Sequence, residues 1–478
     1  RADPSHPDER PTRRLYEQVA VTGHRASDCT PVLRQTVVLL SVFARPRPVH
    51  WWNQFPAPLQ EVASIRLLAS LGAGGVIYMT PIVFHQASFT ATQVGQGLAA
   101  AALIGTAARL LSGVLLDRGL CCSWPVRAAA VLAFIADFIL LQAQGFGGYL
   151  TGQLLIGLAA GLYFPAIELA VPLSCAGFKS SRGYALARSA DAMGVALGAL
   201  IGAVVTALGL IRAVYLVEAA AVVVMLLVLN WRPLPDGRAA LLHLDDVDQE
   251  HSTAKPPSAD GWRWLTPLLP VLAISIVATG MIALRQSALP LDLVRGGLSR
   301  PAVSEAGSGA LIALQLALLV VLQWPVGNWV AKRSLRFGLG MGLVGFVIGC
   351  LLLASSALWS GGMVLISLAM LPLAFGEAAF LPSAAEAMVE ETPLKHRGLS
   401  MALFSQCFAI SATGAPLLAG TLLDQQGHGV QLWLLMAVIC LAVMPLLKTV
   451  RPRYTAGLDG TPLENDEDVP SPRIASLR

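Results

Sequence analysis

Four ionisable side chains stand inside long apolar stretches of this 478-residue sequence. Asp137 interrupts AVLAFIADFILL, Glu377 interrupts LAFGEAAF, and Arg109 and Arg285 lie in similar surroundings. A charge near the centre of a bilayer costs at least about 2.5–3.5 kcal/mol, so each of the four is a candidate for function. A carboxyl group held away from water can exchange a proton near neutral pH. The alternative is structural, with each carboxylate paired to an arginine or facing a neighbouring helix.

A second set of charges lies nearer the ends of apolar stretches. Glu168 and Glu386 are expected to pair with arginines of the adjoining loops rather than to bind a solute. Arg188 and Asp191 are three residues apart, so one helix face can bring them together.

The residues give little evidence for a metal site, a nucleotide site, an enzyme active site or a nucleic-acid interface. Cys121 and Cys122 are adjacent but lack companion ligands, so no metal site is expected. GMGLVG (340–345) matches a dinucleotide-binding pattern, but it opens an apolar stretch instead of following a strand. No Walker A motif or nucleophile–base set appears, so we expect no cofactor and no enzymatic activity. The net charge of +4 gives no case for nucleic acid.

Composition places these residues in a membrane. The chain is 55% hydrophobic and 13% charged, with a mean hydropathy of +0.64, whereas soluble domains carry about 25% charged residues. A bilayer crossing needs roughly 20 apolar helical residues, and backbone in lipid must satisfy its own hydrogen bonds. We therefore predict an all-α membrane protein of about twelve helices. The expected spans are 62–84, 94–116, 126–144, 148–174, 185–210, 212–231, 265–290, 306–331, 337–357, 361–388, 399–423 and 429–450.

Basic residues predict the orientation. They concentrate in the loops after the second, fourth, eighth and tenth spans, whereas the loops after the first, third, ninth and eleventh spans hold none. Arg212, Arg295 and Arg300 are the exceptions. We expect both termini on the cytoplasmic side of an inner or plasma membrane.

The polar stretch 232–263 divides the chain into two bundles, 61–231 and 264–450. Residues 1–60 and 451–478 are expected to be disordered cytoplasmic tails. The linker is expected to be cytoplasmic as well.

The two bundles share sequence features that indicate an internal duplication. GLYFPAIELAVPLSCAGFKSSRGYALA and GEAAFLPSAAEAMVEETPLKHRGLSMA each contain a bulky-apolar–Pro step, a glutamate and an Arg–Gly pair. GVLLDR (113–118) aligns with GNWVAK (327–332), with Ala331 at the place of Asp117. Two related halves are typical of transporters, whose substrate site lies between them near the midplane.

At these residues the chain resembles the major facilitator superfamily, over about residues 60–450. The family's G-x-x-x-D-R-x-G-R-R loop is similar to Gly113, Asp117 and Arg118 here, although the second glycine and the basic pair are missing. The exporter pattern G-x-x-x-G-P-x-x-G-G on the fifth helix resembles GVALGALIGA (194–203), with alanines at the proline and final glycine positions. Gln153 stands where drug–proton antiporters usually carry an arginine.

The resemblance implies roles for particular residues. Glu377, Arg285, Tyr78, Tyr163 and Gln286 would line the central cavity, and Arg109 and Asp137 are further substrate or coupling candidates. Glu377 is the first choice for proton coupling and Asp137 the second. A cytoplasmic gate would involve Gly113, Asp117, Arg118, Gly327, Lys332, Glu168, Glu386, Arg182 and Arg397. The glycines Gly194, Gly198 and Gly202 fit either close helix packing or a hinge.

The expected function is secondary active transport of a small organic solute by alternating access, as ion-coupled export by a monomer. The partners would be the solute, the lipid bilayer and H⁺ or Na⁺ as coupling ion. Solute uptake coupled to protons or sodium is the alternative within transport. A membrane assembly or pigment-delivery factor that keeps the fold without turnover is the alternative of another class.

Overall fold

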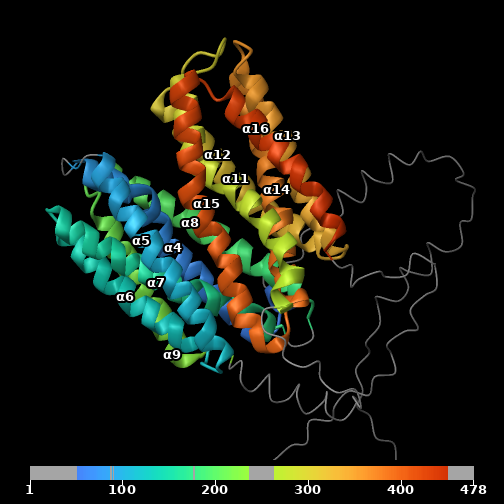
Figure 1. Cartoon of the computed structure of the whole chain (residues 1–478). Coiled ribbons are helices and arrows are strands. Elements are labelled where there is room, and N and C mark those ends of the chain that lie inside the picture. Colours follow the sequence, from blue (N-terminus) through green and yellow to red (C-terminus); the bar gives the residue numbers. More distant parts are fainter. Residues whose placement is uncertain (1–50, 87–88, 90, 176–177, 236–262, 451–478) are drawn as a thin grey trace, which may run out of the picture. The chain divides into compact units, whose positions relative to one another are not determined.

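The computed structural model describes residues 51–86, 89, 91–175, 178–235 and 263–450 of the chain (Figure 1). Most of both expected tails, and residues 236–262 of the expected linker, lie outside these ranges. The chain divides into a unit Arg1–Gln54 and a unit Phe55–Arg478, and every helix discussed below belongs to the second.

Within the described residues, the second unit is built from long helices, most of them joined by short connections (Figure 1). The N-terminal half contains α4 (Ala57–Gln86), α5 (Ala91–Asp117), α6 (Ser123–Gln142), α7 (Phe146–Leu173), α8 (Ser180–Ala207) and α9 (Ala213–Trp231). The C-terminal half contains α11 (Leu269–Arg295), α12 (Glu305–Val330), α13 (Leu335–Ser356), α14 (Gly362–Glu391), α15 (Arg397–Gln426) and α16 (Val430–Val443). Three short 3₁₀ helices accompany them: η1 (Arg263–Leu268), η2 (Leu394–His396) and η3 (Met444–Lys448).

These helices confirm the predicted fold class. Within the described residues, eleven helices are long and apolar enough to cross a membrane, and α4, with 30 residues, is the twelfth long helix. Each overlaps one of the twelve expected spans. The observed helix ends differ from the expected ones by a few residues. The start of α4 is an example, because Ala57 lies inside the expected N-terminal tail.

The two halves pack by the same plan. In the N-terminal half α4 contacts α8 and α9, α7 contacts α5 and α6, and α6 contacts α9. In the C-terminal half α11 contacts α15 and α16, α14 contacts α12 and α13, and α13 contacts α16. Because helices at equivalent chain positions repeat the same pairings, the fold is a pseudo-symmetric pair of six-helix bundles.

Local sequence explains where several helices begin and end. The hydroxyls of Ser304 and Ser334 accept hydrogen bonds from backbone N–H groups in the first turns of α12 and α13, at 3.1 and 3.3 Å. Such caps satisfy donors that a helix leaves free at its start. Gly427 ends α15 with a φ of +72°, a conformation that glycine adopts without strain.

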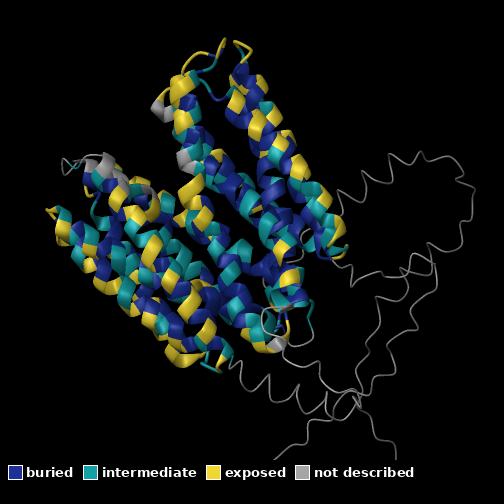
Figure 2. Ribbon diagram, in the orientation of Figure 1, coloured by how far each residue is buried: buried dark blue, intermediate teal, exposed yellow. Residues whose placement is uncertain are grey.

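Burial divides each helix into an inner and an outer face (Figure 2). Large apolar side chains remain exposed on the outer faces, such as Leu103, Phe138, Leu200, Val364 and Val438. A soluble protein rarely leaves so much apolar surface uncovered. The outer faces therefore match a hydrocarbon environment.

The halves meet through two equivalent helix pairs, α5 with α15 and α8 with α12. Four connections at one end of the helices carry Arg118, Lys179, Lys332 and Lys395, and we call this the basic end. The end of α5 and the start of α15 lie there, as do the start of α8 and the end of α12. The other end of the helices is called the opposite end.

The expected linker begins as a packed segment. Leu234 is buried, and its backbone N–H donates to the Ser123 hydroxyl at the start of α6, at 2.8 Å. The Cys121 thiol lies 3.9 Å from the Leu234 carbonyl oxygen. The first residues after α9 therefore fold back onto the basic end.

Candidate functional site

At the basic end, Asp117 joins the two halves directly. Its carboxylate accepts hydrogen bonds from the backbone N–H groups of Gly398, at 2.7 Å, and Leu399, at 3.1 Å. These groups open α15, so an aspartate at the end of α5 caps a helix of the other half. A carboxylate at a helix N-terminus also interacts favourably with the helix dipole.

The equivalent pair, α8 with α12, uses different groups for the same junction. The Lys179 ammonium donates to the Ala331 carbonyl oxygen, and Arg182 Nε donates to the Asn328 side-chain oxygen at 2.9 Å. Ala331 occupies the position of Asp117 in the aligned motifs. The acceptor at the α8–α12 junction is therefore a backbone carbonyl oxygen, whereas the acceptor at the α5–α15 junction is the Asp117 carboxylate.

Glycines allow the close approach of both junctions. A Cβ atom at Gly113 would lie 2.7 Å from the Ala402 Cβ, and one at Gly327 would lie 2.7 Å from the Ala185 Cβ. Both distances are shorter than real side chains tolerate. The two glycines that the duplication aligns therefore occupy equivalent places between the halves.

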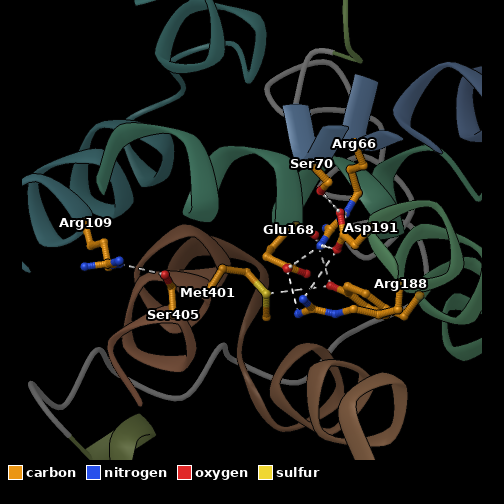
Figure 3. A network of polar contacts seen from close by, with 9 residues as sticks. Arg66, Ser70, Arg109, Glu168, Arg188, Asp191, Met401 and Ser405 are labelled. Atoms are coloured by element: carbon orange, nitrogen blue, oxygen red, sulfur yellow. Dashed lines mark hydrogen bonds and ion pairs between the residues drawn. The ribbon is translucent and has the colours of Figure 1, made fainter. Parts of the chain in front are cut away.

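Four charges gather inside the N-terminal half in the N-bundle charge cluster of Arg66, Glu168, Arg188 and Asp191 (Figure 3). Arg66 Nη2 donates to Glu168 Oε1 at 3.1 Å, and Arg66 Nε donates to Asp191 Oδ1 at 3.1 Å. Arg188 Nη2 reaches the same Glu168 oxygen at 2.8 Å. Arg188 also pairs with Asp191 at 3.6 Å, as their spacing predicts.

This cluster keeps polar atoms free. Arg66 Nη1, Glu168 Oε2 and Arg188 Nε are buried without a hydrogen-bond partner among the described residues, and so is the Tyr163 hydroxyl. Tyr163 lies close enough to interact electrostatically with all four charges. Unpaired polar atoms that converge in one place are typical of sites that bind a ligand or water.

The cluster also contacts the other half. The Arg188 guanidinium lies 5.8 Å from the centre of the Phe408 ring on α15, and the Tyr184 hydroxyl lies 3.6 Å from the Met401 sulfur. Tyr184 in turn donates to the Glu168 backbone oxygen at 3.1 Å. Movement of α15 would therefore disturb residues that touch Glu168 and Arg188.

Arg109 lies between the halves, as Figure 3 shows. Its Nε donates to the Ser405 hydroxyl of α15 at 2.9 Å, while Nη1 is buried without a partner in the described chain. One turn away, Gln406 Nε2 donates to the Thr106 hydroxyl at 2.9 Å. Arg109 is thus a residue of the interface and not of the N-bundle charge cluster.

In the C-terminal half, the structure pairs the two residues expected in the central cavity. Arg285 Nη1 lies 2.5 Å from Glu377 Oε2, with side chains only 10% and 9% exposed. The Gln315 side-chain oxygen accepts from the same Arg285 nitrogen at 2.9 Å, in the amide orientation that also bonds the Met370 carbonyl oxygen. Glu377 is the sixteenth of the 30 residues of α14, so this pair lies at mid-depth.

Asp137 lies apart from these groups. It faces Glu218 of α9 within hydrogen-bonding reach. Asp137 is 1% exposed and Glu218 7% exposed. The structure therefore gives this acid a carboxyl partner in the same half and does not bring it to Glu377.

The glycines of α8 form a close seam with α4. A Cβ atom at Gly194 would lie 2.5 Å from the Leu67 carbonyl oxygen, and one at Gly198 would lie 2.1 Å from the Leu71 carbonyl oxygen. At Gly202 the nearest atom would be 3.2 Å away. Close helix packing accounts for all three positions.

The remaining predicted gate residues are placed differently. Arg118 is exposed, and so is Lys332, and no side-chain bond is described for either. Glu386 lies against Ser181 at the start of α8, with Lys179 nearby. Arg397, the first residue of α15, is half-buried and lies near Tyr184. Glu168 pairs with Arg66 and Arg188 and not with a loop arginine, which differs from the expectation.

Two predicted cavity residues add little to the site. The side chain of Tyr78 lies outside the described residues. Gln286 is exposed on α11, so it points away from its buried neighbour Leu284.

Sequence reasoning missed Arg66, Glu218, Gln315 and Asp292. Arg66, Glu218 and Gln315 are polar residues inside expected apolar spans, which is the signal that identified Glu377, whereas Asp292 lies just beyond the expected span 265–290. Asp292 accepts from Gly429 N at 2.9 Å and from Trp433 Nε1 at 3.0 Å, and Arg300 Nη2 lies 3.2 Å from it. This fully bonded acid fastens α11 to α16 at the opposite end.

Burial also makes the thiol of Cys175, near the basic end, unreactive at neutral pH. Removal from water, with Glu386 close by, raises the pKa of the Cys175 thiol to about 12. The thiol donates to the Val171 carbonyl oxygen at 3.2 Å. Cys175 therefore acts as a small packed side chain at neutral pH.

Comparison with known proteins supports the same architecture. The sequence profile described as Major Facilitator Superfamily matches residues 261–473. No curated protein sequence matches the chain.

Solved structures resemble the whole fold. An MFS transporter, FucP, in the outward conformation shares 15% identity over 83% of this chain and 99% of its own, with a TM-score of 0.63. The human organic anion transporter MFSD10 (TETRAN) shares 16% over 81% and 98%, with a TM-score of 0.59. A POT family transporter in complex with 5-aminolevulinic acid shares 13% over 83% and 97%, with a TM-score of 0.63. The Major Facilitator Superfamily profile thus matches the C-terminal half of the chain, and the paired six-helix bundles are similar in fold to solved transporters of that superfamily.

Proposed function

We propose that the protein is a secondary transporter that moves a small organic solute across the membrane by alternating access. The observation that carries this proposal is the pair of equivalent junctions at the basic end, where Asp117 binds the start of α15 and Lys179 binds the end of α12. Polar contacts of this kind are individually modest. A hydrogen bond to a charged group contributes about 1.5–3 kcal/mol, which a bound solute can offset.

The solute site is proposed between the Arg285–Glu377 pair and the N-bundle charge cluster. Arg285 and Glu377 retain about a tenth of their exposure, so they are not sealed in packing. Arg66, Glu168 and Arg188 each have an unpaired polar atom among the described residues. Both charge signs are present on each side, which favours a solute with ionic or strongly polar groups.

Coupling to protons is proposed through Glu377. While Glu377 is ionised it holds Arg285, and a proton on Glu377 would release the guanidinium for an anionic group of the solute. FucP, one of the fold relatives, is described as a fucose:proton symporter from E. coli. The likeness supports a proton as the coupling ion without indicating the solute.

The direction of transport follows from the gradient in this proposal, and the glycines of α8 do not favour export. Their positions are accounted for by contact with α4, since Gly198 approaches the Leu71 carbonyl oxygen too closely for any side chain. The exporter-like pattern therefore has a packing explanation. Either direction is compatible with the same site.

The basic end is proposed to face the cytoplasm. Arginines near the opposite end are occupied by other groups: Arg300 by Asp292, Arg295 by Asp424, and Arg212 by the Leu141 carbonyl oxygen. Exposed basic side chains such as Arg118 and Lys332 lie at the basic end. Positive charge on the cytoplasmic side is the general rule for membrane helices.

The test begins with a thermal-shift screen of the purified protein against small organic ions, because a bound ligand raises apparent stability. A compound that binds is then offered to proteoliposomes under an imposed pH gradient. We expect gradient-driven accumulation by the wild type. Glu377→Gln should abolish the dependence on the pH gradient and leave solute exchange intact, whereas Asp424→Asn should behave as the wild type.

The outcomes distinguish a wrong assignment of Glu377 from a wrong proposal of transport. If Glu377→Gln retains full proton coupling, the assignment of Glu377 is wrong. If the wild type binds a solute but moves neither solute nor protons under any gradient, the transport proposal fails, and a non-transporting assembly role becomes the better explanation.

A further inference from the structure

Asp137 and Glu218 form a pair of buried acids away from the face where the halves meet. Asp137 lies on α6 and Glu218 on α9, and the two helices pack together. Their side chains are within hydrogen-bonding reach of each other. Both are more than nine-tenths buried, at 1% and 7% exposure.

The two acids have no described hydrogen-bond donor. Both oxygens of Asp137 and the Oε2 atom of Glu218 are buried without a partner among the described residues. An ionised carboxylate only accepts hydrogen bonds, so two ionised groups cannot bond each other. A single proton turns one of them into a donor, so that one acid can hydrogen-bond the other.

The surrounding helices supply no counter-charge in the described part of the chain. Arg212, at the start of α9, donates to the Leu141 carbonyl oxygen at 2.8 Å, and the Tyr215 hydroxyl bonds the Thr80 hydroxyl at 3.2 Å. From α4, the neighbour of Glu218 is Gly72, where a Cβ atom would lie 3.0 Å from the Glu218 Cγ. No ionisable group of α7 or α8 is described against either carboxyl.

Two adjacent carboxylates in a low-dielectric interior cannot both remain charged without a cation. We infer that Asp137 and Glu218 share one proton and form a proton-binding site inside the N-terminal half, separate from Glu377. The proton is the ligand, and the pair holds it at neutral pH. Its use in coupling rests on the proposed transport function, but its existence does not.

The site has a short route to one aqueous side. Asp137 is five residues from Gln142, where α6 ends, and Glu218 is five residues from Ala213, where α9 begins. At 1.5 Å per residue this places the pair roughly 8 Å from the opposite end of the helices. Protons would therefore reach it from that side and not from the basic end.

The pair also contacts α4, which carries Arg66. Gly72 meets Glu218 on one face of α4, while Gly74 meets the Val195 carbonyl oxygen of α8 on another. Loss of the proton would place two like charges beside this tightly fitted helix. The state of the acid pair is thereby linked to the helix that contributes Arg66 to the N-bundle charge cluster.

The experiment counts protons and requires no transport activity. Purified protein in weakly buffered detergent at pH 7 is denatured, and the protons released are measured for the wild type, Asp137→Asn/Glu218→Gln and the control Asp424→Asn. Exposed in the denatured chain, both acids ionise at this pH. We expect the wild type and the control to release one proton more than the double variant.

A second measurement covers the case in which the double variant does not fold. Infrared spectra of the folded wild type, with ¹³C-labelled aspartate in one sample and ¹³C-labelled glutamate in another, are compared with those of the single variants Asp137→Asn and Glu218→Gln. We expect a protonated-carboxyl band that moves with one label and is lost in at least one single variant.

The pH dependence of unfolding adds a third readout. Since the folded protein holds one proton more than the unfolded chain, its unfolding equilibrium should rise tenfold per pH unit between about pH 5 and the point where the pair ionises fully. The double variant should lack this slope. Equal proton counts, or no protonated carboxyl assigned to either acid, would overturn the inference.

Discussion

Removal of the Asp117 carboxylate should loosen the basic end by a predictable amount. The carboxylate caps α15 through two backbone N–H groups, at 2.7 and 3.1 Å. Asp117→Ala removes both bonds, and the loss of a helix cap costs about 0.5–2 kcal/mol. Asp117→Asn keeps an oxygen acceptor and loses mainly the interaction with the helix dipole, about 0.3–1 kcal/mol.

These energies convert into populations. A loss of about 0.5–2 kcal/mol changes an equilibrium between joined and separated halves by about 2- to 30-fold, and by about fivefold for the typical 1 kcal/mol. The asparagine variant should change it only about two- to fivefold. The structure therefore predicts a graded series in which alanine has a larger effect than asparagine.

The assay is a pulsed electron paramagnetic resonance distance measurement. Nitroxide labels at Arg118 and Lys395, both exposed at the basic end, report the distance between α5 and the connection before α15. The fraction of the long-distance population should rise from wild type to asparagine to alanine. Asp424→Ala, which removes an exposed carboxylate at the opposite end, is the matched control.

Two results would refute the reasoning. If neither variant changes the distance distribution, Asp117 does not hold the halves together. If Asp117→Ala and Asp117→Asn raise the long-distance population equally, the hydrogen bonds from Gly398 and Leu399 contribute nothing beyond the interaction of the Asp117 charge with the helix dipole.

Other perturbations have equally definite outcomes. Gly198→Ala should destabilise the protein by roughly 1–3 kcal/mol in thermal unfolding, because its Cβ would lie 2.1 Å from a carbonyl oxygen of α4, whereas Gly414→Ala has open space. Asp292→Asn should cost about 3–5 kcal/mol, since the buried Arg300 loses the carboxylate that pairs with its charge among the described residues, against about 0–1 kcal/mol for the exposed Asp424→Asn. Cys175, whose pKa is raised to about 12, should react with thiol reagents at pH 7.5 only after unfolding, and label incorporation in the folded state would contradict this.

Much of the fold could be predicted from the sequence because lipid imposes simple rules. Spans of about twenty apolar residues had to be helices, and the aligned motifs around Asp117 and Ala331 indicated two related halves. The structure confirms the helices and the pseudo-symmetric bundles. The predicted ends of helices were less accurate, since α4 begins at Ala57, five residues before the apolar span expected from residue 62.

The site was harder to predict, for reasons that the packing makes plain. A span shows that a charge is buried but not which helix face it occupies, so Arg285 and Glu377 could be named without their contact. Arg66 and Glu218 lie near span ends and resembled residues at the water boundary. Pairing across helices 50 or more residues apart depends on rotation about each helix axis, which hydropathy does not encode.

The unequal junctions have a consequence for how this protein tolerates mutation. On the α5–α15 side the acceptor is the Asp117 side chain, so a single codon change can remove it. On the α8–α12 side the acceptor is the Ala331 carbonyl oxygen, which every amino acid at that position would still provide. The side chains open to loss there are Lys179 and, in a separate contact, Arg182 and Asn328. A single substitution at Asp117 can therefore remove both of its contacts with α15, whereas the α8–α12 junction keeps a second polar contact when either Lys179 or Arg182 is replaced.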